Sequence, residues 1–251
     1  MEAVLPIVLL LSVLIGVSLG LLGGGGSILT VPILTMAAGM ETKAAIASSL
    51  FVVAVTSAAG VISHARAGRV RWRIGILFGL AGMAGAFGGG RIAASIPGSV
   101  LMILFGLMMA ATAIAMLRGP TTAKPSMVTD LPTSKIIAEG VVVGVVTGLV
   151  GAGGGFLVVP ALVLLGGLSM ELAVGTSLVV ISMKSFAGLA GHLGHVSIDW
   201  PIVLAITGTA VVGSLIGGKL AGRIPPAMLR RGFGVFIIVM AVVVLGKELL
   251  A

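Results

Sequence analysis

The chain has 251 residues, of which 58% are hydrophobic and only 9% are charged, and its mean hydropathy is +1.29. About a quarter of the residues of a soluble domain are charged, so this composition excludes a soluble domain. It predicts an all-α polytopic membrane protein. The excess of 15 basic over 7 acidic residues is then explained by the placement of loops, and no nucleic-acid partner is expected.

Apolar runs of membrane-helix character follow one another along almost the whole chain. A run over 4–22 ends in glycines, a short apolar piece covers 28–38, and longer helices are predicted over 43–64, 74–90 and 99–117. A polar stretch rich in Pro, Thr and Lys, residues 118–135, is predicted to be a cytoplasmic linker. The same order then returns, with pieces over 136–150 and 156–166 and helices over 171–192, 201–218 and 227–246.

The second half of the chain repeats the first at a fixed offset of 128 residues. The segment GVSLGLLGGGGSILTVPIL, which begins at Gly16, aligns with GVVTGLVGAGGGFLVVPAL, which begins at Gly144. At the same offset Trp72 meets Trp200 and His64 meets His192, and both residue types are scarce in this chain. The sequence therefore predicts an internal duplication with a first repeat over 1–117 and a second over 136–251.

Basic residues in equivalent loops predict that the two repeats have opposite orientations. The loop after the first long helix is basic in the first repeat but not in the second, whereas the loop after the second long helix shows the reverse. Since basic loops stay in the cytoplasm, we expect inverted-topology repeats in the cell (cytoplasmic) membrane, with both termini outside. The residues placed in the cytoplasm are Arg66, Arg69, Arg71, Arg73, Arg118, Lys124, Lys135, Lys219, Arg223, Arg230 and Arg231; Lys43, Arg91 and Lys247 fall outside.

The glycine runs are expected to lie at membrane depth. The short piece after each run has about 11 residues, roughly 17 Å as a helix, which is too little to cross the hydrocarbon. Two arrangements fit, a re-entrant hairpin or a discontinuous pair of crossings, each with three long transmembrane helices per repeat. Glycines spaced along a helix, such as Gly85, Gly213 and Gly217, are instead expected to allow close helix packing.

Contiguous glycines break a helix, and irregular backbone at depth is tolerated only where protein or a water-filled cavity covers it. There, successive N–H groups can converge on one anion, and the following short helix adds a partial positive charge at its N-terminus. Ser27 is expected to cap that helix near Ile28. The predicted anion-binding residues are Gly23, Gly24, Gly25, Gly26 and Ser27 in the first repeat and Gly151, Gly153, Gly154 and Gly155 in the second.

Three further residues are candidates for the same site. Lys184 is the only basic residue inside a predicted span, and Ser177 lies on its helix face, with Ser49 at the equivalent position of the first repeat. The alternative for Lys184 is a side chain that reaches the membrane interface. His64 and His192 stand at helix ends and are interpreted as polar caps, and Glu139 is expected to pair with Lys135.

The doubled motif, GLLGGGGSILTVPIL and GLVGAGGGFLVVPAL, is followed in each half by a Ser-Leu pair (ASSL and GTSL) and then by a tryptophan. This pattern resembles the sulfite exporter TauE/SafE family over essentially the whole chain. The resemblance implies a membrane transporter of sulfite, sulfonates or other small organosulfur anions. The two motifs differ, because Ala152 replaces Gly24 and Gly155 replaces Ser27, so the two half-sites are not chemically equal.

The function expected from the sequence is secondary transport of a small sulfur-containing anion, outward, by alternating access around a midplane site, with protons as a candidate coupling ion. An anion channel or a membrane subunit without coupling is an alternative. An intramembrane enzyme is disfavoured because the histidines lie at helix ends and Asp130 and Asp199 in loops. The chain has no cysteine, and no catalytic residue, metal or cofactor is expected.

Overall fold

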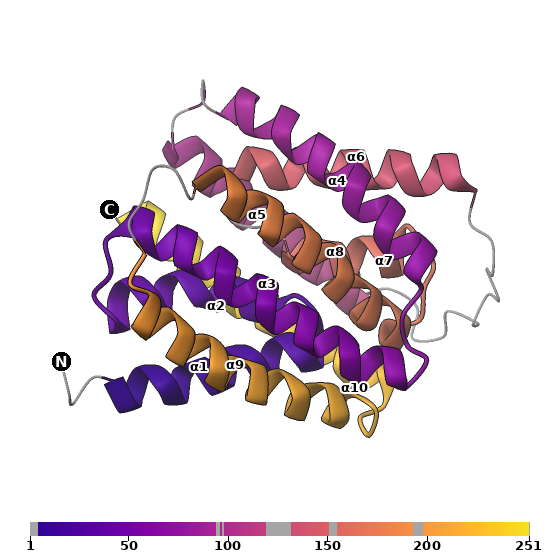
Figure 1. Ribbon diagram of the computed structural model, residues 1–251. Coiled ribbons are helices and arrows are strands. Elements are labelled where there is room, and N and C mark those ends of the chain that lie inside the picture. The colour runs from indigo at the N-terminus through magenta and orange to yellow at the C-terminus, as the bar shows by residue number, and fades with distance from the viewer. Residues whose placement is uncertain are drawn as a thin grey trace.

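The computed structural model describes residues 5–93, 96, 98–118, 132–150, 155–192 and 198–250. All regular structure in these ranges is helical, which confirms the all-α prediction (Figure 1). The helices are α1 (Leu5–Leu22), α2 (Gly25–Pro32), which continues into a π-helical turn η1 (Ile33–Ala37), α3 (Thr42–Arg66), α4 (Trp72–Ala93), α5 (Gly98–Arg118), α6 (Thr133–Val150), α7 (Gly155–Leu164), α8 (Met170–His192), α9 (Trp200–Ala221) and α10 (Pro226–Leu250).

Five of these helices are long and apolar enough to cross a membrane. They contain the candidate spans 44–66, 72–89, 170–190, 200–221 and 226–243. Each candidate span coincides with one of the long helices expected from the sequence. The remaining expected long helix is α5, in which the described apolar run covers 106–118. The chain is therefore a multi-pass membrane protein.

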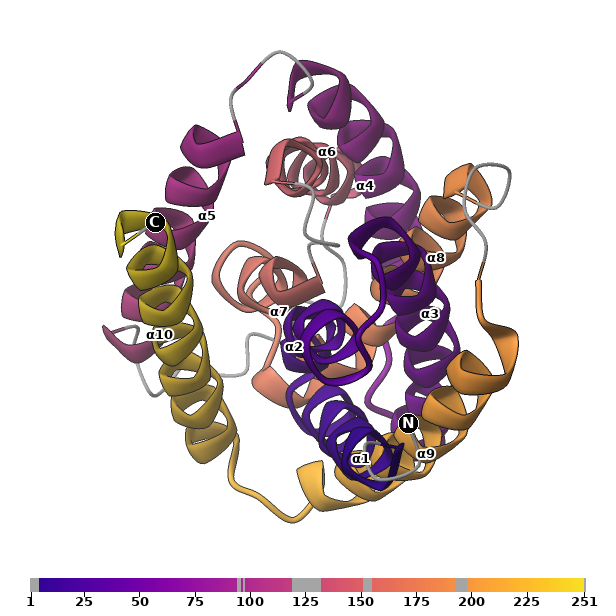
Figure 2. The ribbon, with the colours of Figure 1, turned by 90° about the vertical axis from the view of Figure 1, so that its left-hand side faces the viewer.

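The two shortest α-helices, α2 and α7, lie at the centre of the bundle and the longer helices surround them (Figure 2). Around this centre α1 packs along α9, α6 packs along α4, α3 packs along α8, and α5 lies beside α10. In each of the first two pairs, the first helix of one half packs on the penultimate helix of the other half. The two halves are thus interleaved, and neither forms a separate domain core.

Contacts between the halves come in equivalent pairs. Between α3 and α8, Leu50 lies against Gly188 and Gly60 lies against Leu178, positions that exchange when 128 is added or subtracted. In the same way, Gly106 and Gly234 of α5 and α10 lie against Leu245 and Leu117. In both pairs of helices, a contact at a higher residue number on the first helix meets a lower residue number on the second. Helix α3 therefore runs antiparallel to α8, and α5 runs antiparallel to α10.

Glycines bring the surrounding helices close together. A Cβ added at Gly213 of α9 would overlap the Val13 carbonyl oxygen and lie 3.0 Å from the Val17 amide nitrogen of α1. Gly85 of α4 faces the equivalent backbone atoms of α6. Backbone-to-backbone approach of this kind is how small residues drive helix association in lipid, where the hydrophobic effect gives little. The packing interpretation of these spaced glycines is confirmed.

Gly213→Ala is expected to lower the stability of the folded bundle by about 1–3 kcal/mol, because the added methyl group forces α1 and α9 apart. The matched control is Gly208→Ala on the same helix, where a Cβ would have open space. That control is expected to leave stability unchanged or raise it by up to about 1 kcal/mol through helix propensity. The midpoint of thermal unfolding in detergent measures both, and equal effects of the two substitutions would contradict the packing account.

Candidate functional site

The first glycine run forms a buried turn. Helix α1 ends at Leu22, Gly23 has a positive φ of 76°, and α2 starts at Gly25. The N–H of Gly23 donates to the Leu19 carbonyl oxygen at 2.8 Å, and residues 23–26 are all buried. Gly26 lies against Ile15 and Leu19 of α1, so the chain doubles back on itself at this turn. A side chain at Gly23 would be strained by the backbone conformation alone.

The prediction that Ser27 caps the short helix is wrong. Helix α2 begins at Gly25, about one turn earlier than expected, and its N-cap is Gly24, which provides no side-chain cap. The Ser27 hydroxyl instead donates to the Gly24 carbonyl oxygen at 2.7 Å. The sequence rule failed because the backbone of the last glycines of the run is free to adopt the helical conformation. The N-terminus of α2 therefore carries no side-chain acceptor for its first N–H groups.

The N-termini of α2 and α7 meet at the centre of the bundle (Figure 2). Gly155 is the first residue of α7, and a Cβ added there would lie 2.7 Å from the Ser27 hydroxyl oxygen. A Cβ added at Gly24 would lie 2.8 Å from the Phe156 Cα. Ser27 and Gly155 are equivalent positions of the repeat, so the halves meet here through corresponding residues. The other predicted residues of the second run, Gly151, Gly153 and Gly154, lie outside the described residues.

The structure brings one of the two candidate serines to the first turn. The Ser177 hydroxyl of α8 lies 3.4 Å from the Gly23 carbonyl oxygen and donates to the Val174 carbonyl oxygen at 2.8 Å. The Ser49 hydroxyl is buried and donates to the Ile46 carbonyl oxygen of its own helix at 2.7 Å. Ser177 therefore belongs to the surroundings of the turn, whereas the described contact of Ser49 is within α3.

Lys184 reaches across to the helix that leads into the second glycine run. Its Nζ donates to the Thr147 Oγ1 of α6 at 2.8 Å, and that hydroxyl donates to the Gly144 carbonyl oxygen at 2.9 Å. The Lys184 stem passes Gly82 of α4. Thr147 is a neutral group, so this hydrogen bond satisfies one donor of the ammonium group without neutralising its charge.

Sequence reasoning missed Thr147. It is buried, with 5% of its surface exposed, and stands one turn before Gly151. The signal was present in the repeat itself, because the equivalent position of the first half is Leu19. A hydroxyl that replaces leucine in one copy of an apolar repeat indicates a local polar partner, and here that partner is Lys184.

The polar groups away from this centre have structural roles. His64 is fully buried, and its Nε2 donates to the Gly20 carbonyl oxygen at 2.9 Å, which ties the end of α3 to α1. This contact supports the interpretation of His64 as a polar cap; the side chain of His192 lies outside the described residues. Lys135 Nζ lies 3.7 Å from Glu139 Oε1, which confirms the expected pair.

Comparisons with known proteins cover nearly the whole chain. The sequence model of a family described as "Sulfite exporter TauE/SafE" matches residues 8–244. The chain is 36% identical to a probable membrane transporter protein of Xylella fastidiosa, over 94% of this chain and 92% of that protein. It is 30% identical to one from Methanocaldococcus jannaschii, over 90% of each chain. No solved structure matches.

Thr147→Val is expected to cost about 1–3 kcal/mol of stability, because it leaves the half-buried Lys184 ammonium without this acceptor while keeping the shape of the side chain. Adding Lys184→Met to Thr147→Val should recover most of that loss, since an apolar pair replaces an unpaired charge. Thermal unfolding midpoints of the two single variants and the double variant form the test. Additive effects would show that the two side chains do not interact.

Proposed function

The chain belongs to the sulfite exporter TauE/SafE family of membrane transporters, and on that basis we propose that it is a secondary transporter that exports a small sulfur-containing anion. Sulfite, a sulfonate or a similar organosulfur anion is the substrate class. The proposed mechanism is alternating access around a site near the membrane midplane. The family is one of transporters and not of enzymes. The substrate class and the alternating-access mechanism are proposed.

The proposed membrane topology consists of two inverted-topology repeats, 1–117 and 136–251, joined by a cytoplasmic linker over 118–135. It is supported by the antiparallel arrangement of α3 with α8 and of α5 with α10. If α3 crosses the membrane toward the cytoplasm, its equivalent α8 crosses away from it. The start of α1 and the end of α10 lie toward the same end of the bundle (Figure 1), which agrees with both termini being outside.

The observation that carries the proposal is the meeting of two helix N-termini, those of α2 and α7, where Ser27 faces Gly155. Each N-terminus holds a partial positive charge and N–H groups that lack intrahelical partners. Two such ends that face each other repel in a medium of low dielectric constant. An anion bound between them would accept hydrogen bonds from N–H groups at the two helix ends and turn that repulsion into attraction.

Side chains around this centre are proposed to complete the site. Lys184 supplies a full positive charge near the end of α6, the helix that leads into the second glycine run, and Thr147 holds it there. Ser177 places a hydroxyl next to the first turn. The half-sites differ, because Ser27 of α2 faces a glycine in α7, so backbone N–H groups are available on both sides and a hydroxyl on one. To donate to the anion, the Ser27 hydroxyl would have to leave the Gly24 carbonyl oxygen.

Export of such an anion needs little additional energy. A membrane potential that is negative inside drives each negative charge outward with about 2.3 kcal/mol per 100 mV. At equal concentrations on the two sides, uncoupled export of a monoanion is therefore downhill. Protons are the candidate coupling ion for export against a concentration gradient that exceeds this electrical energy. A pH gradient imposed on liposomes distinguishes the two cases.

The test is flux of labelled sulfite in liposomes that contain the purified protein, under an imposed potential. We expect saturable flux, and a decrease of at least about tenfold in Lys184→Met, which corresponds to about 1.4 kcal/mol. Lys219→Met removes an exposed charge at the end of α9 and is expected to leave the flux unchanged. Wild-type flux in Lys184→Met would remove Lys184 from the site, and flux that never saturates would indicate a channel.

A further inference from the structure

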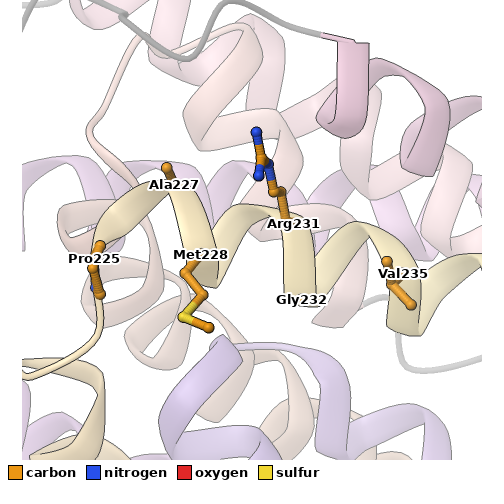
Figure 3. Close-up of a pocket in the computed structure, with 6 residues that line it drawn as sticks. All are labelled: Pro225, Ala227, Met228, Arg231, Gly232 and Val235. Atoms are coloured by element: carbon orange, nitrogen blue, oxygen red, sulfur yellow. The ribbon is translucent and has the colours of Figure 1, made fainter.

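The first turns of α10 carry a hollow that the transport site does not use (Figure 3). Its floor is open at Gly232, where an added Cβ would meet no atom within 4 Å. Met228 and Val235 flank it with 64% and 54% of their surfaces exposed. The six residues that line it are Pro225, Ala227, Met228, Arg231, Gly232 and Val235. All but Arg231 are apolar or lack a side chain, so the hollow is an apolar groove with one positively charged side chain.

Arg231 is placed where a charge needs a partner. It lies inside the candidate span 226–243, and its side chain is exposed. No hydrogen bond or ion pair joins its guanidinium to another described residue. In Figure 3 the guanidinium extends away from the helix, on the side of Ala227. A charge on a lipid-facing surface costs a few kcal/mol unless it reaches water or a lipid phosphate.

The surroundings of the hollow are positively charged. Helix α9 ends at Ala221 and α10 begins at Pro226, so Lys219, Arg223 and Arg230 lie at the same end of the bundle as Arg231. The sequence has no acidic residue between Asp199 and Glu248. No acidic side chain of α9 or of the spanning part of α10 can therefore neutralise Arg231, and an anionic headgroup is its complementary ligand.

We propose that this hollow is a binding site for one anionic phospholipid. The phosphate group binds the Arg231 guanidinium through charge-assisted hydrogen bonds, and one acyl chain lies over Gly232 between Met228 and Val235. An apolar groove alone would take any lipid, and a cation alone would take any phosphate. The two together select a lipid with a net negative headgroup, such as phosphatidylglycerol, over phosphatidylcholine. The site does not depend on the proposed transport function.

Native mass spectrometry of the purified protein, incubated with phosphatidylglycerol or with phosphatidylcholine of the same acyl chains, measures the lipid that is retained. Wild type is expected to retain phosphatidylglycerol preferentially. Arg231→Gln should reduce that preference about fivefold, the effect of one basic residue at a membrane surface. Arg91→Gln removes an exposed charge from the last turn of α4, which is not part of the hollow, and should change the preference little. An equal loss of the preference for phosphatidylglycerol in both variants, or no loss in Arg231→Gln, would overturn the proposed lipid site.

A second pair of variants tests the acyl chain. Gly232→Leu fills the open floor of the hollow and is expected to reduce lipid retention about as much as Arg231→Gln, although the charge remains. Gly208→Leu adds the same side chain at another open, exposed glycine, on α9, and should have no effect. Unchanged lipid retention in Gly232→Leu would contradict the placement of the acyl chain over Gly232. Displacement of the lipid by glycerol 3-phosphate, which has no acyl chain, would show that only headgroup charge is bound and would equally overturn it.

Discussion

The structure depends on one constraint, that every backbone N–H and C=O group in the membrane interior needs a partner. The glycine run over residues 23–26 interrupts the helical ladder inside the bundle, and the chain satisfies the constraint by burying the turn against protein. Gly23 hydrogen-bonds back to α1, and Gly24 lies directly against the first residues of α7. What remains at the start of α2 is a set of N–H groups without side-chain acceptors, at the point where the two halves meet.

Glycine has a second role in the surrounding helices. Where α1 meets α9 and α4 meets α6, glycines let one backbone approach another, and the leucine–glycine pairs between α3 and α8 and between α5 and α10 repeat in exchanged order. Such contacts rely on shape and not on the hydrophobic effect, which does not favour helix association in lipid. The same residue type thus fixes the rigid packing of the long helices and breaks the short ones. Contiguity along the sequence decides which role a glycine has.

Much of this could be predicted from the sequence, because apolar run length and the repeat at an offset of 128 are strong signals. The helix positions are confirmed to within a few residues. The N-cap assigned to Ser27 is wrong, because the preceding glycines can adopt the helical conformation and α2 starts at Gly25, before the serine. The partnership of Lys184 with Thr147 depends on where the fold places α6 relative to α8, which no local pattern encodes. The division into repeats, their orientation in the membrane and the anion site stay predictions.

The proposed transport site requires an anion to bind between the N-termini of α2 and α7. Anomalous diffraction from crystals soaked with selenite, the heavier analogue of sulfite, locates the anion directly. We expect an anomalous peak within hydrogen-bonding distance of the backbone nitrogens of Gly25 and Gly26, next to the point where Ser27 faces Gly155. Peaks confined to the basic loops, at a selenite concentration that inhibits sulfite flux, would contradict it.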